Sequence, residues 1–259
     1  MSFFSPEEFL KKQVAAVQEY AILSGTAVAN LFTRPRYWAD IYTQMDSIGV
    51  GSMPIVVLTG LFTGCVLALQ SATALKQFGA VSKTGSLVAL SMVKELGPVL
   101  TGLMVSGRNA SGMASEIGSM KVTEQLDAMR ALGTDPIRKL VTPRIVATIF
   151  MLFFLTIVSD AMGILGGALV SVNLVGLNPS SYLMDSYRTL VYGDVVQGLV
   201  KPLFSGFIIA TVGCFYGMRT TGGTQGVGRA TTQAVVVSSV FIIVVDFLVT
   251  RAMIGIFGS

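Results

Sequence analysis

The chain alternates between long apolar stretches and shorter polar segments. Five apolar stretches approach or exceed the roughly 20 residues that a helix needs to cross a bilayer. They predict membrane-spanning helices at residues 53–75, 86–106, 145–172, 195–218 and 230–257. The sequence therefore predicts an all-α, polytopic membrane protein with about five transmembrane helices.

The first fifty residues follow a different pattern. Ser5 fits an N-cap, Pro6 fits the first helical position, and Glu8 completes a capping box. The helix predicted from there to about Leu31 mixes charged and apolar positions, so we expect it to lie in the membrane interface. Thr33 and the basic, proline-containing residues after it should break this helix. We treat residues 1–259 as one domain, with interfacial N-terminal helices at 1–50 and a transmembrane bundle at 51–259.

A charged segment between the second and third spans predicts one amphipathic helix over residues 119–132, with Thr123 as its N-cap. Gly133 should end it and Pro136 should prevent its continuation. Its apolar side consists of Val122, Leu126, Met129 and Leu132. Its charged side consists of Glu124, Asp127 and Arg130. Such a helix either docks a soluble partner or rests on the membrane surface.

Composition supports a membrane protein and excludes several kinds of chemistry. Hydrophobic residues make up 52% of the chain and charged residues 12%, against about 25% charged in soluble domains. The absence of histidine removes imidazole catalysis and the commonest metal ligand, so we expect no catalytic or metal site. Cys65 and Cys214 lie in apolar runs and should be core residues. The net charge of +4 is too small to indicate nucleic-acid binding.

No nucleotide-binding motif is present in the sequence. The glycine-rich connector at residues 219–229 lacks the Gly-x-x-x-x-Gly-Lys-Ser/Thr pattern of a phosphate-binding loop, so we expect a tight loop there. Any ATP and magnesium that this protein depends on should therefore be bound by a separate chain. We expect no cofactor in this one.

Basic residues predict the orientation, because cytoplasmic loops are enriched in lysine and arginine. Before the first span they are Lys11, Lys12, Arg34 and Arg36. Between the second and third spans they are Arg108, Lys121, Arg130, Arg138, Lys139 and Arg144. Between the fourth and fifth spans they are Arg219 and Arg229. These segments should be cytoplasmic. The N-terminus is then inside, and five spans place the C-terminus outside.

Five charged residues fall within or near the ends of the predicted spans: Lys94, Glu95, Asp160, Lys201 and Asp246. An isolated charge there costs at least a few kcal/mol, so each should be paired or face a polar cavity. For Asp160 and Asp246 we expect buried pairing. The other three should face a cavity, because Pro98 and Pro202 follow closely and free backbone groups.

The central fifty residues resemble the signature of the MlaE (YrbE) family. The matching positions, in order, are Glu95-Leu96-Gly97-Pro98-Val99, Gly107-Arg108, Glu116, Gly118, Met120, Thr123-Glu124-Gln125, Asp127-Ala128, Asp135-Pro136 and Pro143-Arg144. Members of that family are permease subunits of bacterial ABC transporters that move phospholipids between the inner and outer membranes. Lys94 departs from the pattern, since members often have arginine there. Lysine keeps the positive charge, but it cannot bind phosphate in the bidentate way that arginine does.

The resemblance implies an inner-membrane subunit that supports outer-membrane lipid asymmetry. It implies four kinds of partner: a second copy of the chain, cytoplasmic ABC ATPase subunits, a periplasmic MCE-domain lipid-binding protein and a phospholipid. The ATPase would dock on a coupling helix formed by Thr123, Glu124, Gln125, Asp127, Met129 and Arg130. Its closure would make the spans rock and open or collapse a lipid pocket between the two copies.

A phospholipid pocket needs a cation near an apolar wall. Lys94 and Lys201 are candidates for the cation, with Glu95 orienting Lys94, while Leu67, Leu75 and Phe78 are candidates for the wall. A structural Lys94–Glu95 pair, joined by Arg108, remains open. Two other functions also remain: a secondary transporter with Asp160, Asp246 and Glu95 as a proton relay, and an integral-membrane lipid enzyme. The lack of histidine and of a nucleophile constellation argues against the enzyme.

Overall fold

The computed structural model describes residues 6–31, 33 and 37–257, with only the backbone for residues 6–10, 12, 256 and 257. This part of the chain is almost entirely helical, and no strand occurs in it. The α-helices are α1 Pro6–Leu31, α2 Trp38–Lys76, α3 Thr84–Ser91, α4 Gly97–Val105, α5 Ser111–Val122, α6 Gln125–Ala131, α7 Thr142–Asn173, α8 Pro179–Thr189, α9 Tyr192–Met218 and α10 Gly223–Phe257. A 3₁₀-helix, η1 Val81–Lys83, precedes α3, and three π-helical segments interrupt the longer helices: η2 Met92–Leu96, η3 Ser106–Ala110 and η4 Ile137–Val141.

Five helical stretches are long and apolar enough to cross a membrane. They are Trp38–Lys76, Val81–Val122, Ile137–Asn173, Tyr192–Met218 and Gly223–Gly255. This confirms the predicted all-α polytopic membrane protein. Most stretches extend beyond the predicted spans; the first begins at Trp38 rather than near Met53. Ile48, Gly49 and Ser52 are buried in it, so tertiary packing carries the helix past the polar residues that lowered the apolar signal.

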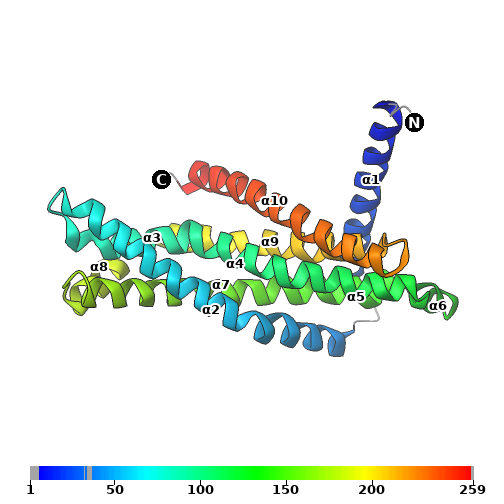
Figure 1. The fold of residues 1–259 in the computed structure, drawn as a ribbon, viewed down its shortest axis with the longest axis horizontal. Helices are drawn as coiled ribbons and strands as arrows, with labels where there is room; N and C mark the ends of the chain where they lie inside the picture. The colour runs from blue at the N-terminus through cyan, green and yellow to red at the C-terminus, as the bar shows by residue number, and fades with distance from the viewer. Residues whose placement is uncertain (1–5, 32, 34–36, 258–259) are drawn as a thin grey trace.

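The first and third spans, α2 and α7, lie side by side along the bundle (Figure 1). Gly60 and Gly64 permit this close approach. A Cβ atom on Gly64 would lie 1.8 Å from the carbonyl oxygen of Gly163, and one on Gly60 would lie 2.7 Å from that of Ser159. The predicted small-residue pair therefore packs two helices of the same chain, as expected of routine packing.

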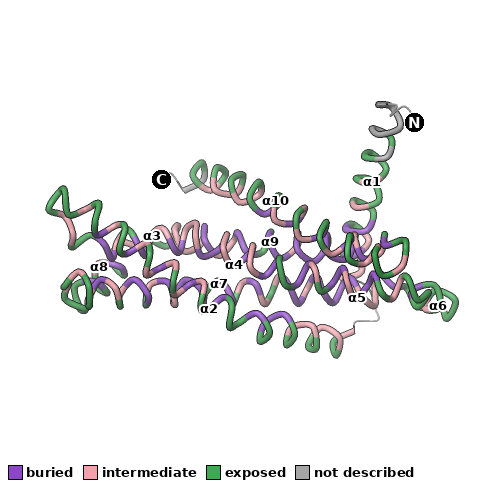
Figure 2. Tube along the Cα trace, in the orientation of Figure 1, coloured by how far each residue is buried: buried purple, intermediate pink, exposed green. Residues whose placement is uncertain are grey.

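The two ends of the bundle carry different elements (Figure 1). One end holds α6, the α9–α10 turn and the beginning of α2, while α8 and the beginning of α3 lie at the other. This arrangement matches the alternation of basic loops along the sequence. The helix α1 projects away from the bundle at the α6 end, and most of its described surface is exposed (Figure 2). Its predicted end at Leu31 is confirmed, whereas the expected cap at Ser5 lies outside the described residues.

Two connecting segments differ from the prediction. The glycine-rich connector is not a loop over residues 219–229, because α10 already begins at Gly223 and only a short turn precedes it. Buried Ala230 and Ala234 anchor the first turns of α10 in the bundle, which offsets the low helix propensity of its glycines. Residues 173–194 contain the helix α8, which the sequence analysis does not predict. Its N-cap is Asn178, whose side chain accepts a hydrogen bond from the Ser180 amide at 3.0 Å.

Candidate functional site

A cluster of charged side chains connects the second, fourth and fifth spans. Its centre is Lys201 on α9, whose side chain is 1% exposed. The Lys201 ammonium donates to Glu95 of η2 and to the backbone carbonyl of Lys94 at 2.8 Å, and it lies 3.2 Å from Asp246 of α10. An ammonium group has three N–H donors, and three oxygen atoms surround this one. Lys201 is therefore fully used inside the protein.

Pro98 explains why the Lys94 carbonyl is available. In a regular helix this carbonyl would accept from the amide four residues later, but that residue is Pro98, which has no N–H. The preceding segment, η2, adopts π-helical geometry, and Lys201 supplies the missing donor. The freed backbone group is as expected, but Lys201 is buried and paired and does not face a cavity as predicted. Irregular backbone is tolerated in a membrane span where protein side chains satisfy it.

Lys94 itself points to a different partner. Its ammonium lies 3.0 Å from a carboxylate oxygen of Asp194, near the beginning of α9, and the two side chains are 23% and 17% exposed. A Lys94–Glu95 pair is therefore wrong, since Glu95 pairs with Lys201 instead. Lys94 is more accessible than Lys201, which makes it the better candidate for meeting a ligand.

Sequence reasoning misses three members of the cluster. It places Asp194 in a loop, and it gives no role to Gln197 or Thr250. The Gln197 amide donates to Glu95 at 3.3 Å, and the Thr250 hydroxyl donates to the same carboxylate at 3.3 Å. A signal is nevertheless present in the sequence. Residues 194, 197 and 201 are spaced to share one face of a helix, as are 246 and 250.

The two remaining intramembrane carboxylates behave differently. Asp246 is paired with Lys201, as expected. Asp160 on α7 is buried, and its Oδ1 has no hydrogen-bond partner in the described part of the chain, so its predicted pairing is wrong. The side chain points at Gly97, where an added Cβ would lie 1.7 Å from Asp160 Oδ1. It occupies space that only a glycine leaves open, beside the π-helical segment.

The three predicted wall residues do not lie together. Leu67 is half-buried against the cluster formed by Ala68, Val88 and Met92, and it lines a shallow apolar groove with Leu96, the neighbour of Glu95. Leu75 is half-buried near the end of α2, about 12 Å farther along the helix axis. Phe78 lies beyond α2 and is 80% exposed. Only Leu67 is placed beside the charged cluster.

Arg108 does not join the charged cluster. It lies in η3, where its guanidinium donates to the carbonyl of Ser47 at 2.9 Å and to the hydroxyl of Ser52 at 3.2 Å. Both acceptors belong to α2. The suggestion that Arg108 completes a pair with Lys94 and Glu95 is therefore wrong.

The predicted coupling segment is helical but is not one helix. The helix α5 ends at Val122, and Thr123 with Glu124 forms a turn before α6 begins at Gln125. Thr123 is not an N-cap, because its hydroxyl donates back to the Ser119 carbonyl at 2.9 Å and closes α5. Glu124 has a positive φ of 60° and occupies the N-cap position without a side-chain hydrogen bond.

The faces of α6 agree only in part with the prediction. Leu126 is 1% exposed and Met129 is half-buried, but Val122 and Leu132 are 38% and 84% exposed. Gly133, with a φ of 77°, ends the segment as predicted. Glu124, Gln125, Asp127 and Arg130 are all outside the core, at the surface of this end of the bundle. The charged residues of the predicted coupling segment are therefore accessible to a partner.

Asp127 organises the charged face of α6. Its carboxylate lies 3.0 Å from Lys121 and 3.1 Å from Arg130, and the hydrogen bond from Lys121 lowers its pKa. The helix before it, α5, is tied to α7 by Glu116 and Arg144, whose side chains lie 2.8 Å apart. Arg144 is 2% exposed. The segment that carries α6 is thus fastened to the third span.

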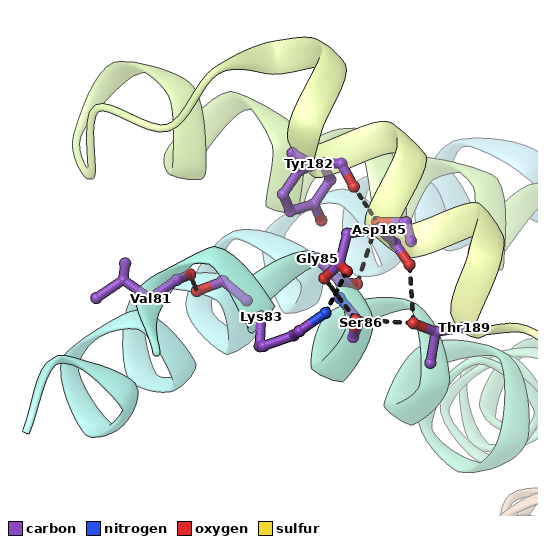
Figure 3. Close-up of polar contacts among 9 residues, drawn as sticks. Val81, Lys83, Gly85, Ser86, Tyr182, Asp185 and Thr189 are labelled. Atoms are coloured by element: carbon purple, nitrogen blue, oxygen red, sulfur yellow. Dashed lines mark hydrogen bonds and ion pairs between the residues drawn. The ribbon is translucent and has the colours of Figure 1, made fainter. Parts of the chain in front are cut away.

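A second polar cluster joins α8 to α3 at the opposite end (Figure 3). Asp185 accepts hydrogen bonds from the amide and hydroxyl of Ser86 and lies 2.9 Å from Lys83. Burial by itself would raise the pKa of Asp185, but the bonds from Ser86 and Lys83 outweigh it and the pKa is lowered. Thr189 donates to the Ser86 hydroxyl at 2.7 Å. This cluster fixes the connection between the third and fourth spans.

Comparison with known proteins decides the family. The profile of the permease MlaE family matches residues 41–252 of the chain. The chain belongs to the MlaE permease family. It is 42% identical over 242 residues to a probable ABC transporter permease protein of Rickettsia typhi, covering 93% of each protein.

Two further relatives widen the comparison. The intermembrane phospholipid transport system permease protein MlaE of Haemophilus influenzae is 37% identical over 221 residues, which is 85% of each protein. The chloroplastic protein TRIGALACTOSYLDIACYLGLYCEROL 1 of Arabidopsis thaliana is 33% identical over 249 residues, or 96% of this chain and 70% of that protein. The resemblance read from the central motif residues is confirmed. This MlaE-family chain is a multi-pass membrane permease, and its charged cluster lies inside the spans of that permease.

Proposed function

We propose that this chain is the transmembrane subunit of an ABC transporter that moves phospholipids between the inner and outer membranes. The observation that carries the proposal is the match to the MlaE permease family over most of the chain, together with a relative named for intermembrane phospholipid transport. The charged cluster supports it, because Lys94 offers a partly exposed cation inside the spans. The chain would bind a lipid and would not itself hydrolyse ATP.

The proposal includes three protein partners. A cytoplasmic ATPase, holding ATP and magnesium, would dock on the exposed face of α6. A second copy of the chain would pack against α10, whose apolar side chains Val236, Phe241 and Phe247 are more than half exposed. A periplasmic MCE-domain protein would receive or deliver the lipid. We propose no nucleic-acid partner.

The proposed mechanism is mechanical. Closure of the ATPase pushes on α6, and the push passes through α5 and the Glu116–Arg144 pair to α7. The spans then rock, and the lipid site between two copies opens or collapses. Lys94 would hold the lipid phosphate during this cycle and return to Asp194 between cycles.

One observation keeps a second function in view. Asp160 is a buried intramembrane carboxyl whose Oδ1 has no partner among the described residues, and such groups occur in proton relays. A proton-coupled secondary transporter would use it. Against this alternative, Glu95 and Asp246 are both committed to Lys201, so the three carboxylates do not form one chain.

Purification separates the two functions. We expect the full-length chain to co-elute with an ATPase carrying a phosphate-binding loop, and the reconstituted complex to move fluorescent phospholipid between vesicles only when ATP is added. A chain that elutes alone and moves substrate in response to a pH gradient would replace the ABC transporter with the secondary transporter.

The orientation gives a second test. We propose that the chain lies in the bacterial inner membrane with its N-terminus and α6 in the cytoplasm and α8 in the periplasm. Leu132 and Tyr187 are 84% and 79% exposed, so a cysteine at either position should react readily. With Cys65 and Cys214 replaced and only the outer membrane opened, an impermeant thiol reagent should label Tyr187→Cys and spare Leu132→Cys. Labelling of Leu132→Cys would reverse the orientation.

The role of Lys94 gives a third test. Lys94→Ala should reduce co-purified phospholipid by roughly fivefold, because one cation near a lipid phosphate contributes about 1 kcal/mol. Lys94→Arg keeps the charge and should retain the lipid. The control is Lys94→Ala/Asp194→Asn, which removes the uncompensated charge that the single variant leaves, while the amide oxygen can still accept from the Val191 amide. Normal lipid content in Lys94→Ala, with a lowered melting temperature that the double variant restores, would make the pair structural.

A further inference from the structure

A polar pocket lies where α9 turns into α10, between that turn and α1. Its volume is about 420 Å³, within the range of roughly 300–1,000 Å³ found for ligand sites. Three helices contribute to it: Gln13 comes from α1, Phe215 and Arg219 come from α9 or its end, and Arg229 and Gln233 come from α10. The α9–α10 turn that lines it lies at the α6 end of the bundle (Figure 1), and its lining includes no residue of the intramembrane charged cluster.

The pocket holds more positive than negative charge. Arg219 lies 3.3 Å from the Glu19 carboxylate, through its Nε atom, and 5.2 Å over the Phe215 ring. Arg229 is exposed and makes no hydrogen bond or ion pair with any described residue. Two guanidinium groups therefore face one carboxylate. A guanidinium presents paired donors that match the oxygen atoms of a phosphate.

The pocket is also two-faced. Phe215 and Ala230 belong to its lining and are 7% and 5% exposed, so they form an apolar floor. The arginine and glutamine side chains form the polar part. A pocket with a charged polar part above an apolar floor fits an amphiphile better than a small inorganic ion, because only an amphiphile contacts both surfaces.

The helix α1 would gain a link from such a ligand. Its attachments to the bundle include the Tyr20 hydroxyl, 2.7 Å from the Thr211 hydroxyl, and the edge-on contact of Tyr20 with Phe215. Most of its remaining described surface is exposed (Figure 2). A ligand that contacts Gln13 and Arg229 together would bridge α1 to α10.

We propose that this pocket binds the phosphate of an anionic phospholipid, which stays bound and fastens α1 to the α9–α10 turn. This lipid is not cargo, since its site is separate from the charged cluster. The proposal holds whatever the permease transports. In the orientation proposed above, the pocket lies at the cytoplasmic leaflet.

Hydrogen exchange on the purified full-length chain tests this proposal. After delipidation in a neutral detergent, added phosphatidylglycerol should slow exchange in residues 13–20 and 216–229, and phosphatidylcholine at the same concentration should do so less. Arg229→Gln should weaken phosphatidylglycerol binding by about fivefold, whereas Arg229→Lys should retain most of it. The matched control is Arg251→Gln, an exposed arginine near the other end of the same helix, which should bind like the unchanged protein.

Three results would overturn the proposal. The first is an absence of slowed exchange, or equal binding by Arg229→Gln and Arg251→Gln. The second is equal slowing by inorganic phosphate or glycerol phosphate, which would identify a free anion as the ligand. The third is slowing that requires the ATPase subunit and no lipid, which would assign the pocket to a partner side chain. If the proposed transport function proved wrong, none of these measurements would change.

Discussion

Lys201→Met should destabilise the permease more than any other single charge removal in the spans. The substitution leaves Glu95 and Asp246 without their shared cation, and it removes the donor to the Lys94 carbonyl. Breaking a buried ion pair by removing one partner costs about 3–5 kcal/mol. In a chain of this size the melting temperature in detergent should fall by roughly 6–20 °C.

The control for this prediction removes the stranded charges as well. Lys201→Met/Glu95→Gln/Asp246→Asn leaves no uncompensated charge from this group, and the amide oxygen that Glu95→Gln introduces can still accept from Thr250, so most of the lost stability should return. If Lys201→Met melts with the unchanged protein, Lys201 does not hold the three spans together. If the triple variant melts no higher than the single one, the loss comes from packing or from the unsatisfied Lys94 carbonyl and not from charge.

Reversing two charges on α6 should uncouple ATP hydrolysis from transport. Glu124 and Asp127 are both exposed, and an ATPase docked there would meet two cations in place of two carboxylates. If the docked surface of the ATPase is basic, complementing these carboxylates, the reversal places like charges opposite one another. ATP-driven lipid transfer by Glu124→Lys/Asp127→Lys should then fall at least about tenfold, while the chain still inserts. The measurements are complex assembly and lipid-stimulated ATP hydrolysis in nanodiscs.

The matched control is Asp127→Asn. It removes the same ion pairs with Lys121 and Arg130 without reversing the charge, and exposed ion pairs contribute little to stability. This variant should keep most of the coupling. Unchanged assembly and transfer in the double reversal would show that α6 does not receive the ATPase.

The spans can be predicted because each is a long apolar stretch, which can be recognised without knowing the helices that pack against it. The side-chain partners cannot be predicted in the same way. Lys94 and Glu95 are adjacent in sequence, but adjacent residues of a helix point about 100° apart and do not face each other. Their actual partners, Asp194 and Lys201, lie far along the chain, and helix packing decides which charges meet.

The prediction of a single coupling helix is wrong for a local reason. A positive φ at a residue other than glycine is uncommon, so nothing in Glu124 indicates that α5 ends and α6 begins there. The helix α8 is different, because Asn178 and Pro179 are both a turn signal and a helix start. Reading these two residues only as a turn leaves the segment as a connection, whereas the structure uses them as a cap and a first helical position.

The way Lys201 distributes its three donors has a consequence for motion in the bundle. One donor meets a backbone carbonyl, so a change of side chain at position 94 leaves that link intact. Another meets the Glu95 carboxylate, and the ammonium also forms an ion pair with Asp246 on α10. If α9 moved by one turn along its axis, Lys201 would lose its contacts with η2 and with α10. We therefore expect the second, fourth and fifth spans to move together. A rocking motion that admits a lipid should therefore pivot outside the contacts between these three spans.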